Sequence, residues 1–197
     1  LPRLLRLLLL SAAVRVLRPA PAGGQAAAVG QDASAGAVAE VERLVGQIRA
    51  RWPHVRIVLR ADSGFAREAL MSWCERHKVD YVFGLARNAR LVKEIATELA
   101  LAKSAAERTG TAARRFKDFR YQTLDSCPRR VVGKAEQLVA GAGETSANPR
   151  FVVTSLPAAA WPAAELYERL YCARGEMENR IKECQLDLFA DRTSTRA

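Results

Sequence analysis

The 197-residue sequence has few of the side chains that build metal fingers or disulfide frameworks. It contains four cysteines and two histidines, and no two cysteines form a C-x-x-C pair. A structural zinc site needs four closely spaced Cys or His ligands, so this pattern excludes a zinc finger. We expect the cysteines to be reduced thiols in a cytoplasmic protein, at Cys74, Cys127, Cys172 and Cys184.

Residues 1–31 contain no acidic side chain and consist mainly of Leu, Arg, Ala, Pro and Gly. Their apolar run, residues 7–14, is too short to span a bilayer core of about 30 Å, so we expect no membrane association. A leucine core flanked by arginines is also the pattern of a signal or transit peptide, and that alternative stays open. The composition favours a basic arm outside any folded element, or a segment translated out of frame.

The rest of the chain has the composition of a globular domain, with an excess of basic side chains. Over the full 197 residues, Lys and Arg number 31 against 21 Asp and Glu, which gives a net charge of +10. Such an excess favours a polyanionic partner such as nucleic acid. Because most of the basic residues are Arg and the chain is rich in Ala, a coding bias is the alternative explanation.

Hydrophobic periodicity and turn residues predict a mixed α/β domain over residues 32–197. A strand, helix and strand over residues 56–86 have the connection length of a parallel crossover. Between about 108 and 157 the pattern changes to short strands separated by Gly, Pro, Ser and Asn, which indicates a β-rich insertion. We predict helices at 37–52, 67–78, 88–107 and 162–188, and strands at 56–61, 80–86, 114–124, 129–139 and 150–156.

One acidic residue stands in an unusual place. Asp62 directly follows the apolar run "RIVLRA" and is followed by Ser63 and Gly64. A buried strand has little use for a carboxylate, but α/β proteins hold ligands and reactive groups at the carboxyl ends of their strands. Asp62 is therefore either a surface charge at a turn or part of a site.

The last predicted helix carries a second acidic candidate. At about 100° per residue, one stripe is apolar, and Tyr171, Arg174, Glu178 and Lys182 form the stripe beside it. Glu178 is then the acid nearest the core. A solvated face with a favourable Glu178 to Lys182 pair is the structural alternative. Two carboxylates from distant chain positions, Asp62 and Glu178, would suit Mg²⁺, which prefers hard oxygen ligands and phosphate substrates.

These motifs resemble those of the DDE insertion-sequence transposases. In the family signature a Tyr is followed after two residues by Arg, after three more by the catalytic Glu, and after six more by Lys. Here these positions are Tyr171, Arg174, Glu178 and Gln185, so the signature Lys is absent; Lys182 on the same stripe is a candidate to take over its contact. "RADSGFA" resembles the motif of the second Asp and assigns Asp62, and "DYVFGLARN" resembles the strand and turn that come after that motif. The resemblance covers residues 32–197.

The resemblance implies a ribonuclease-H-like mixed sheet with flanking helices and a β-rich insertion. It implies catalytic and metal-binding roles for Asp62 and Glu178, with two Mg²⁺ ions in the intact family and Mn²⁺ as an alternative. It further implies DNA contacts by Tyr171, Arg174 and Lys182, terminal inverted repeats as the DNA partner, and a homodimer as the intact enzyme. The reaction implied is the cutting and rejoining of DNA during transposition.

The first carboxylate of the expected triad has no clear counterpart. It should lie on a strand before the helix that begins near Ser34, but Asp32 is the only nearby acid and has the context of a helix cap. We therefore expect a transposase fragment, truncated at both ends, that does not cleave DNA alone. The alternative is a non-catalytic DNA-binding fragment that interferes with an intact transposase. Arg87 and Arg90 are further candidates for phosphate contacts.

Overall fold

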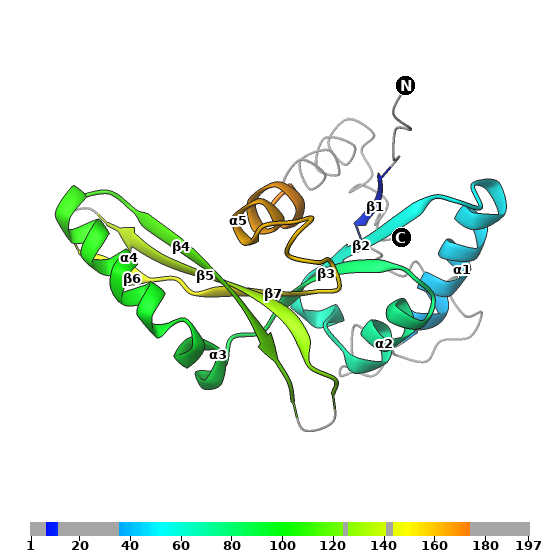
Figure 1. Cartoon of the computed structure of the whole chain (residues 1–197), viewed down its shortest axis with the longest axis horizontal. Coiled ribbons are helices and arrows are strands. Elements are labelled where there is room, and N and C mark those ends of the chain that lie inside the picture. The colour runs from blue at the N-terminus through cyan, green and yellow to red at the C-terminus, as the bar shows by residue number, and fades with distance from the viewer. Residues whose placement is uncertain (1–6, 12–35, 124–125, 141–143, 174–197) are drawn as a thin grey trace, which may run out of the picture.

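A computed structural model describes residues 7–11, 36–123, 126–140 and 144–173. The elements follow one another as a strand and helix, a strand-helix-strand unit, a helical pair, four further strands and a final helix (Figure 1). They are β1 (Leu7–Ser11), α1 (Ala37–Arg51), β2 (Arg56–Ala61), η1 (Ser63–Phe65), α2 (Glu68–Arg76), β3 (Asp80–Leu85), α3 (Ala89–Glu94), α4 (Ala96–Thr109), β4 (Ala113–Tyr121), β5 (Arg129–Val139), β6 (Thr145–Ala147), β7 (Arg150–Thr154), α5 (Ala163–Glu165) and the π-helical turn η3 (Leu166–Tyr171).

The strands form one mixed sheet in the order β1-β2-β3-β7-β5-β4, and β6 pairs with β5 off this path. β1, β2 and β3 are parallel, whereas β7, β5 and β4 join by antiparallel pairing. The three predicted strands of the β-rich segment are present as β4, β5 and β7. Because β7 pairs with both β3 and β5, they continue the central sheet.

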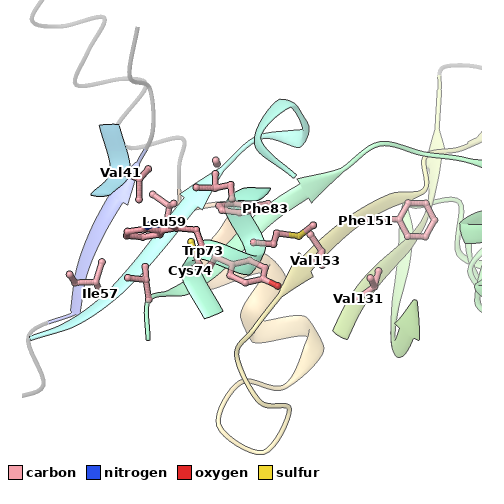
Figure 2. Packing of buried hydrophobic residues seen from close by; sticks show 14 of the residues in the cluster. Val41, Ile57, Leu59, Trp73, Cys74, Phe83, Val131, Phe151 and Val153 are labelled. Carbon is pink, nitrogen blue, oxygen red and sulfur yellow. The ribbon is translucent and has the colours of Figure 1, made fainter. Parts of the chain in front are cut away.

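Hydrophobic cores cover both faces of the sheet. Residues of β2 alternate between them: Ile57 and Leu59 face α1 and α2, and Val58 faces α5 and η3, as the two-residue period of a strand requires. In Figure 1, α2, α3 and α4 lie on one side of the sheet and α5 on the other. Figure 2 shows the larger core, where Trp73 and Cys74 of α2 pack among side chains of the sheet.

Two predicted helices differ from the observed ones. The predicted helix 88–107 is two helices that meet at Ile95, whose φ of −107° and ψ of 19° are not helical. Ile95 is fully buried and lies so near β5 that a Cβ on Gly133 would come within 2.6 Å of it. In the last helix, Leu166–Tyr171 form a wider π-helical turn, and the 3.6-residue period does not apply there. Leu170 is nonetheless buried and Tyr171 half-buried beside it, in agreement with the predicted stripes.

The prediction that residues 1–31 form no folded element is wrong for Leu7–Ser11. These residues form β1, which pairs in parallel with β2 from Leu7 opposite Arg56 to Ser11 opposite Arg60. A continuous apolar run is typical of a strand in the parallel part of a sheet. The backbone of β1 pairs with the edge of β2 that would otherwise be exposed. Asp32 lies outside the described residues.

No helix in the described part of the chain is both long enough and apolar enough to cross a lipid bilayer.

Candidate active site

β2 carries Asp62 to the edge of the sheet where the parallel strands end. The strand is buried up to Ala61, and the chain then turns, with Asp62 at the start of η1. The Oδ1 atom of Asp62 accepts a hydrogen bond from the backbone N–H of Gly64 at 2.9 Å, which caps the turn. The Asp62 side chain is exposed, so a carboxylate oxygen faces solvent at the carboxyl end of β2.

The adjacent strand approaches this turn closely at Gly84. A Cβ atom placed on Gly84 would lie 3.0 Å from the backbone nitrogen of Ser63 and 3.3 Å from the carbonyl carbon of Asp62. The same Cβ would lie 2.6 Å from the hydroxyl oxygen of Tyr171. The space above Gly84 is therefore occupied by the Tyr171 hydroxyl, and two residues predicted to belong to one site meet there although 109 positions separate them.

A buried arginine fastens the last helix to the strand that carries Asp62. Arg60 of β2 is 1% exposed, and its Nη1 atom donates a hydrogen bond to the backbone oxygen of Leu170 at 2.7 Å. Leu170 directly precedes Tyr171. The bond thus fixes the position of Tyr171 relative to Asp62, because Arg60 is only two residues from Asp62 along β2.

An aromatic and basic group extends the site over the sheet. The rings of Tyr167 and Tyr171 lie 5.5 Å apart, and the Nζ atom of Lys134 lies 5.4 Å from the centre of the Tyr167 ring. Burial raises the pKa of the Tyr167 hydroxyl well above its usual range, so this group stays protonated at neutral pH. Tyr167 therefore contributes its ring to the packing of this group.

A hollow of about 310 Å³ lies next to Asp62. Its wall includes Ser63, the end of β3 and the turn between β6 and β7, and it is bordered by Arg87 and Arg150. Arg90, the other basic candidate of this region, lies over the ring of Tyr121 at 5.1 Å and donates to the backbone oxygen of Gln122. Of the two, only Arg87 borders the hollow beside Asp62.

A larger hollow of about 640 Å³ lies at the opposite edge of the sheet, near the start of β3. Its buried arginine is paired: Arg129 contacts both Glu68 and Glu75, and the hydroxyl of Tyr81 donates to Glu75. The side chain of Arg129 is 6% exposed. This network ties α2 to β3 and β5, and it has the character of a structural contact more than of a ligand site.

The predicted site residues divide into two groups. Asp62 and Tyr171 are described and lie together at Gly84. The remaining members lie outside the described residues, and they are Arg174, Glu178, Lys182 and Gln185. Within the described ranges no group of three His, Cys, Asp or Glu side chains is arranged to hold a metal ion. Asp62 lies at the end of β2 and is described, and its carboxylate oxygens are of the type that Mg²⁺ binds.

Sequence reasoning missed two residues that organise this site. Gly84 stands in the middle of a strand, a position that often marks the close approach of another backbone, so a signal was present. Arg60 stands within a buried apolar run, and a buried charge generally requires partners. Neither pattern identifies Tyr171 or Leu170 as the partner, because both lie on an element more than 80 residues away.

Comparison with protein families places the chain in one of them. Residues 5–197 match the family described as transposase DDE domain group 1. The chain belongs to this family of DDE transposase domains, and its function is therefore related to transposition. The match begins at residue 5 and so includes β1, whereas the resemblance found from the motifs covered only residues 32–197. No curated protein matched the sequence.

Proposed function

We propose that this chain is the catalytic domain of a DNA transposase with a ribonuclease-H-like fold, in which Asp62 and Glu178 are metal ligands. One observation carries the proposal: Tyr171, which precedes Glu178 by seven residues in the sequence, lies against the turn that begins with Asp62. Arg60 holds the preceding residue, Leu170, at 2.7 Å. The end of η3 thus lies at the carboxyl end of β2, where a carboxylate from the residues that follow it in the sequence would complete a pair.

The chemistry of the proposed ligands suits Mg²⁺, with Mn²⁺ as an alternative. Asp62 and Glu178 would hold it, and a bound ion of this type supplies charge stabilisation and an activated water for phosphodiester cleavage. Asp62 is positioned for this role because it is exposed and its turn is capped by Gly64. Tyr171, Arg174 and Lys182 would contact the DNA at the element ends.

We further propose that the 197-residue chain binds DNA without cleaving it. β1 precedes α1 and runs parallel to β2, which is where the first carboxylate of the triad was expected. Leu7–Ser11 contain no acid, and the first acid of the chain is Asp32. Each 1.36 kcal/mol of lost transition-state stabilisation costs about tenfold in rate, so a missing ligand costs several orders of magnitude. A DNA-binding chain that interferes with an intact transposase is the second candidate, and the absence of this carboxylate favours it.

Iron-mediated affinity cleavage tests the metal site without requiring DNA cleavage. Fe²⁺ bound in place of Mg²⁺, with ascorbate and peroxide, should cut the polypeptide near residue 62 and near residue 178. Excess Mg²⁺ should suppress both cuts, and Asp62→Asn should abolish them. Glu42→Gln, which removes an exposed carboxylate from α1, is the matched control and should leave both cuts in place. Cuts at only one position, or cuts unaffected by Asp62→Asn, would show that Asp62 and Glu178 do not share an ion.

The second test is a strand-cleavage assay on DNA that carries the element ends, with Mg²⁺ or Mn²⁺. We expect no cleavage by the 197-residue chain. Metal-dependent cleavage that Glu178→Ala abolishes would refute the proposed inactivity and require a third ligand, with Asp32 as the first candidate.

A further inference from the structure

The hollow beside Asp62 is built from segments that are far apart in the sequence. Ser63 contributes from the turn after β2, residues 85–87 from the end of β3, and residues 148–151 from the start of β7. β7 is antiparallel to β3, with Phe151 opposite Leu85, so the start of β7 and the end of β3 lie at the same edge as Asp62. The hollow therefore opens where the proposed metal ligands would meet the substrate.

The charge of this hollow is positive and unbalanced. It is bordered by two arginines and by no acidic residue. Within the described part of the chain, Arg87 and Arg150 form no ion pair with a carboxylate, although other arginines of the sheet do. Arg130 pairs with Asp118, for example, and Arg56 with Asp80. Two guanidinium groups that line one hollow without a carboxylate in an ion pair attract an anion, and their planar donors match phosphate oxygens.

The Arg150 guanidinium is held in place before any ligand arrives. Its Nε atom donates to Oδ1 of Asn148 at 3.1 Å. Asn148 is itself fixed by Glu136, since its backbone N–H donates to the Glu136 carbonyl and its Nδ2 to Glu136 Oε2, both at 2.8 Å. Lys134 also donates to Glu136. Burial alone would raise the pKa of Glu136, but the hydrogen bonds from Lys134 and Asn148 outweigh it and lower that pKa, so Glu136 stays ionised.

We infer that Arg87 and Arg150, with Arg150 positioned by Asn148, form a binding site for the sugar-phosphate backbone of the DNA strand that passes Asp62. The inference rests on the proposed function. Ser63 directly follows Asp62 and lines the hollow, so a strand with a phosphate in the hollow would pass close to Asp62. Binding there would fix the register of the strand at the carboxylates and would not depend on base sequence, because backbone contacts position the DNA without reading it.

DNA binding to the full 197-residue chain, measured by fluorescence anisotropy in EDTA at several salt concentrations, tests the inference. The double variant Arg87→Ala/Arg150→Ala should weaken binding at least tenfold at low salt. Each lost phosphate contact should reduce the slope of log affinity against log salt by about 0.9, so the slope should fall by about 1.8. The matched control is Arg76→Ala/Arg108→Ala, which removes two exposed arginines from the last turns of α2 and α4. It should leave the slope nearly unchanged.

Asn148→Ala tests the positioning of Arg150 separately. It should weaken DNA binding in the wild-type background but have no further effect in the Arg150→Ala background, because Asn148 acts through Arg150. An equal effect in both backgrounds would refute the positioning role. Circular dichroism of each variant establishes that it is folded.

The outcomes separate this inference from the proposed function. If the double variant and the control bind DNA alike, the hollow is not a backbone site, and the metal site at Asp62 is unaffected by that result. If the wild-type chain binds no DNA and shows no iron-mediated cuts, the proposed function fails as well.

Discussion

A side chain added at Gly84 would perturb the candidate site directly. Gly84 has no Cβ, and the Tyr171 hydroxyl and the turn after β2 both lie where a Cβ would be in contact with them. In Gly84→Ala, the new Cβ would lie 2.6 Å from the Tyr171 hydroxyl, about 0.8 Å closer than the 3.4 Å at which ordinary contacts begin. It would also lie 3.0 Å from the Ser63 backbone nitrogen, and this second contact cannot be relieved by a side-chain rotation. Both Tyr171 and the turn after β2 must therefore move.

Such overpacking in a buried position costs about 1–3 kcal/mol of unfolding free energy. For a chain of this size, that corresponds to a fall in melting temperature of about 2–4 °C per kcal/mol. Urea unfolding followed by circular dichroism gives the free energy directly. Gly46→Ala, at an exposed position of α1 where a Cβ meets nothing within 4 Å, is the control and should stabilise the chain by up to about 1 kcal/mol.

Tyr171→Phe tests whether the Tyr171 hydroxyl causes this destabilisation, because it removes the oxygen that the new Cβ would meet. In the double variant Gly84→Ala/Tyr171→Phe, the closest contact is gone and only the Ser63 contact remains. The destabilisation should then be smaller than the sum of the two single effects by at least about 0.5 kcal/mol. Strict additivity would mean that the Tyr171 hydroxyl does not lie over Gly84, and the proposed site would lose the observation that supports it.

Local patterns predicted the strands and the position of Asp62 well. β-branched and aliphatic runs bounded by turn residues predicted β2, β3, β5 and β7, and the strand that ends at Asp62 is where it was expected. The leucine run of β1 lies in a segment of low complexity, whose composition is typical of an unfolded arm and hides the strand pattern of consecutive leucines. A strand in the parallel part of a sheet has that same pattern.

Contacts across the sheet are the part that the sequence did not reveal. The chain of hydrogen bonds from Arg150 through Asn148 to Glu136 depends on the register of β5, β6 and β7, which the residue pattern leaves undetermined. The π-helical turn that contains Tyr171 is likewise not indicated by the residue pattern. The helical stripe could therefore predict that Tyr171 borders the core, but not that its hydroxyl reaches Gly84.

Two further changes test how the last helix and α2 are held to the sheet. Arg60→Met removes the donor to the Leu170 carbonyl and should lower the unfolding free energy by about 1–3 kcal/mol, measured by urea unfolding; an unchanged stability would contradict the anchoring role of Arg60. Arg129 governs the acid response: its hydrogen bonds hold the pKa values of Glu68 and Glu75 below their ordinary range. A carboxyl whose pKa is lower in the folded state stabilises the fold above its unfolded pKa of about 4.3, and that stabilisation is lost as the pH falls through the lowered value. As the pH falls from about 5 to about 2.5, the unfolding free energy of the wild type should consequently decrease more steeply than that of Arg129→Gln. Because both glutamates are more than a third exposed, the difference should be about 1–2 kcal/mol and shrink in high salt, whereas parallel curves for the two proteins would show that Arg129 does not set the charge state of either glutamate.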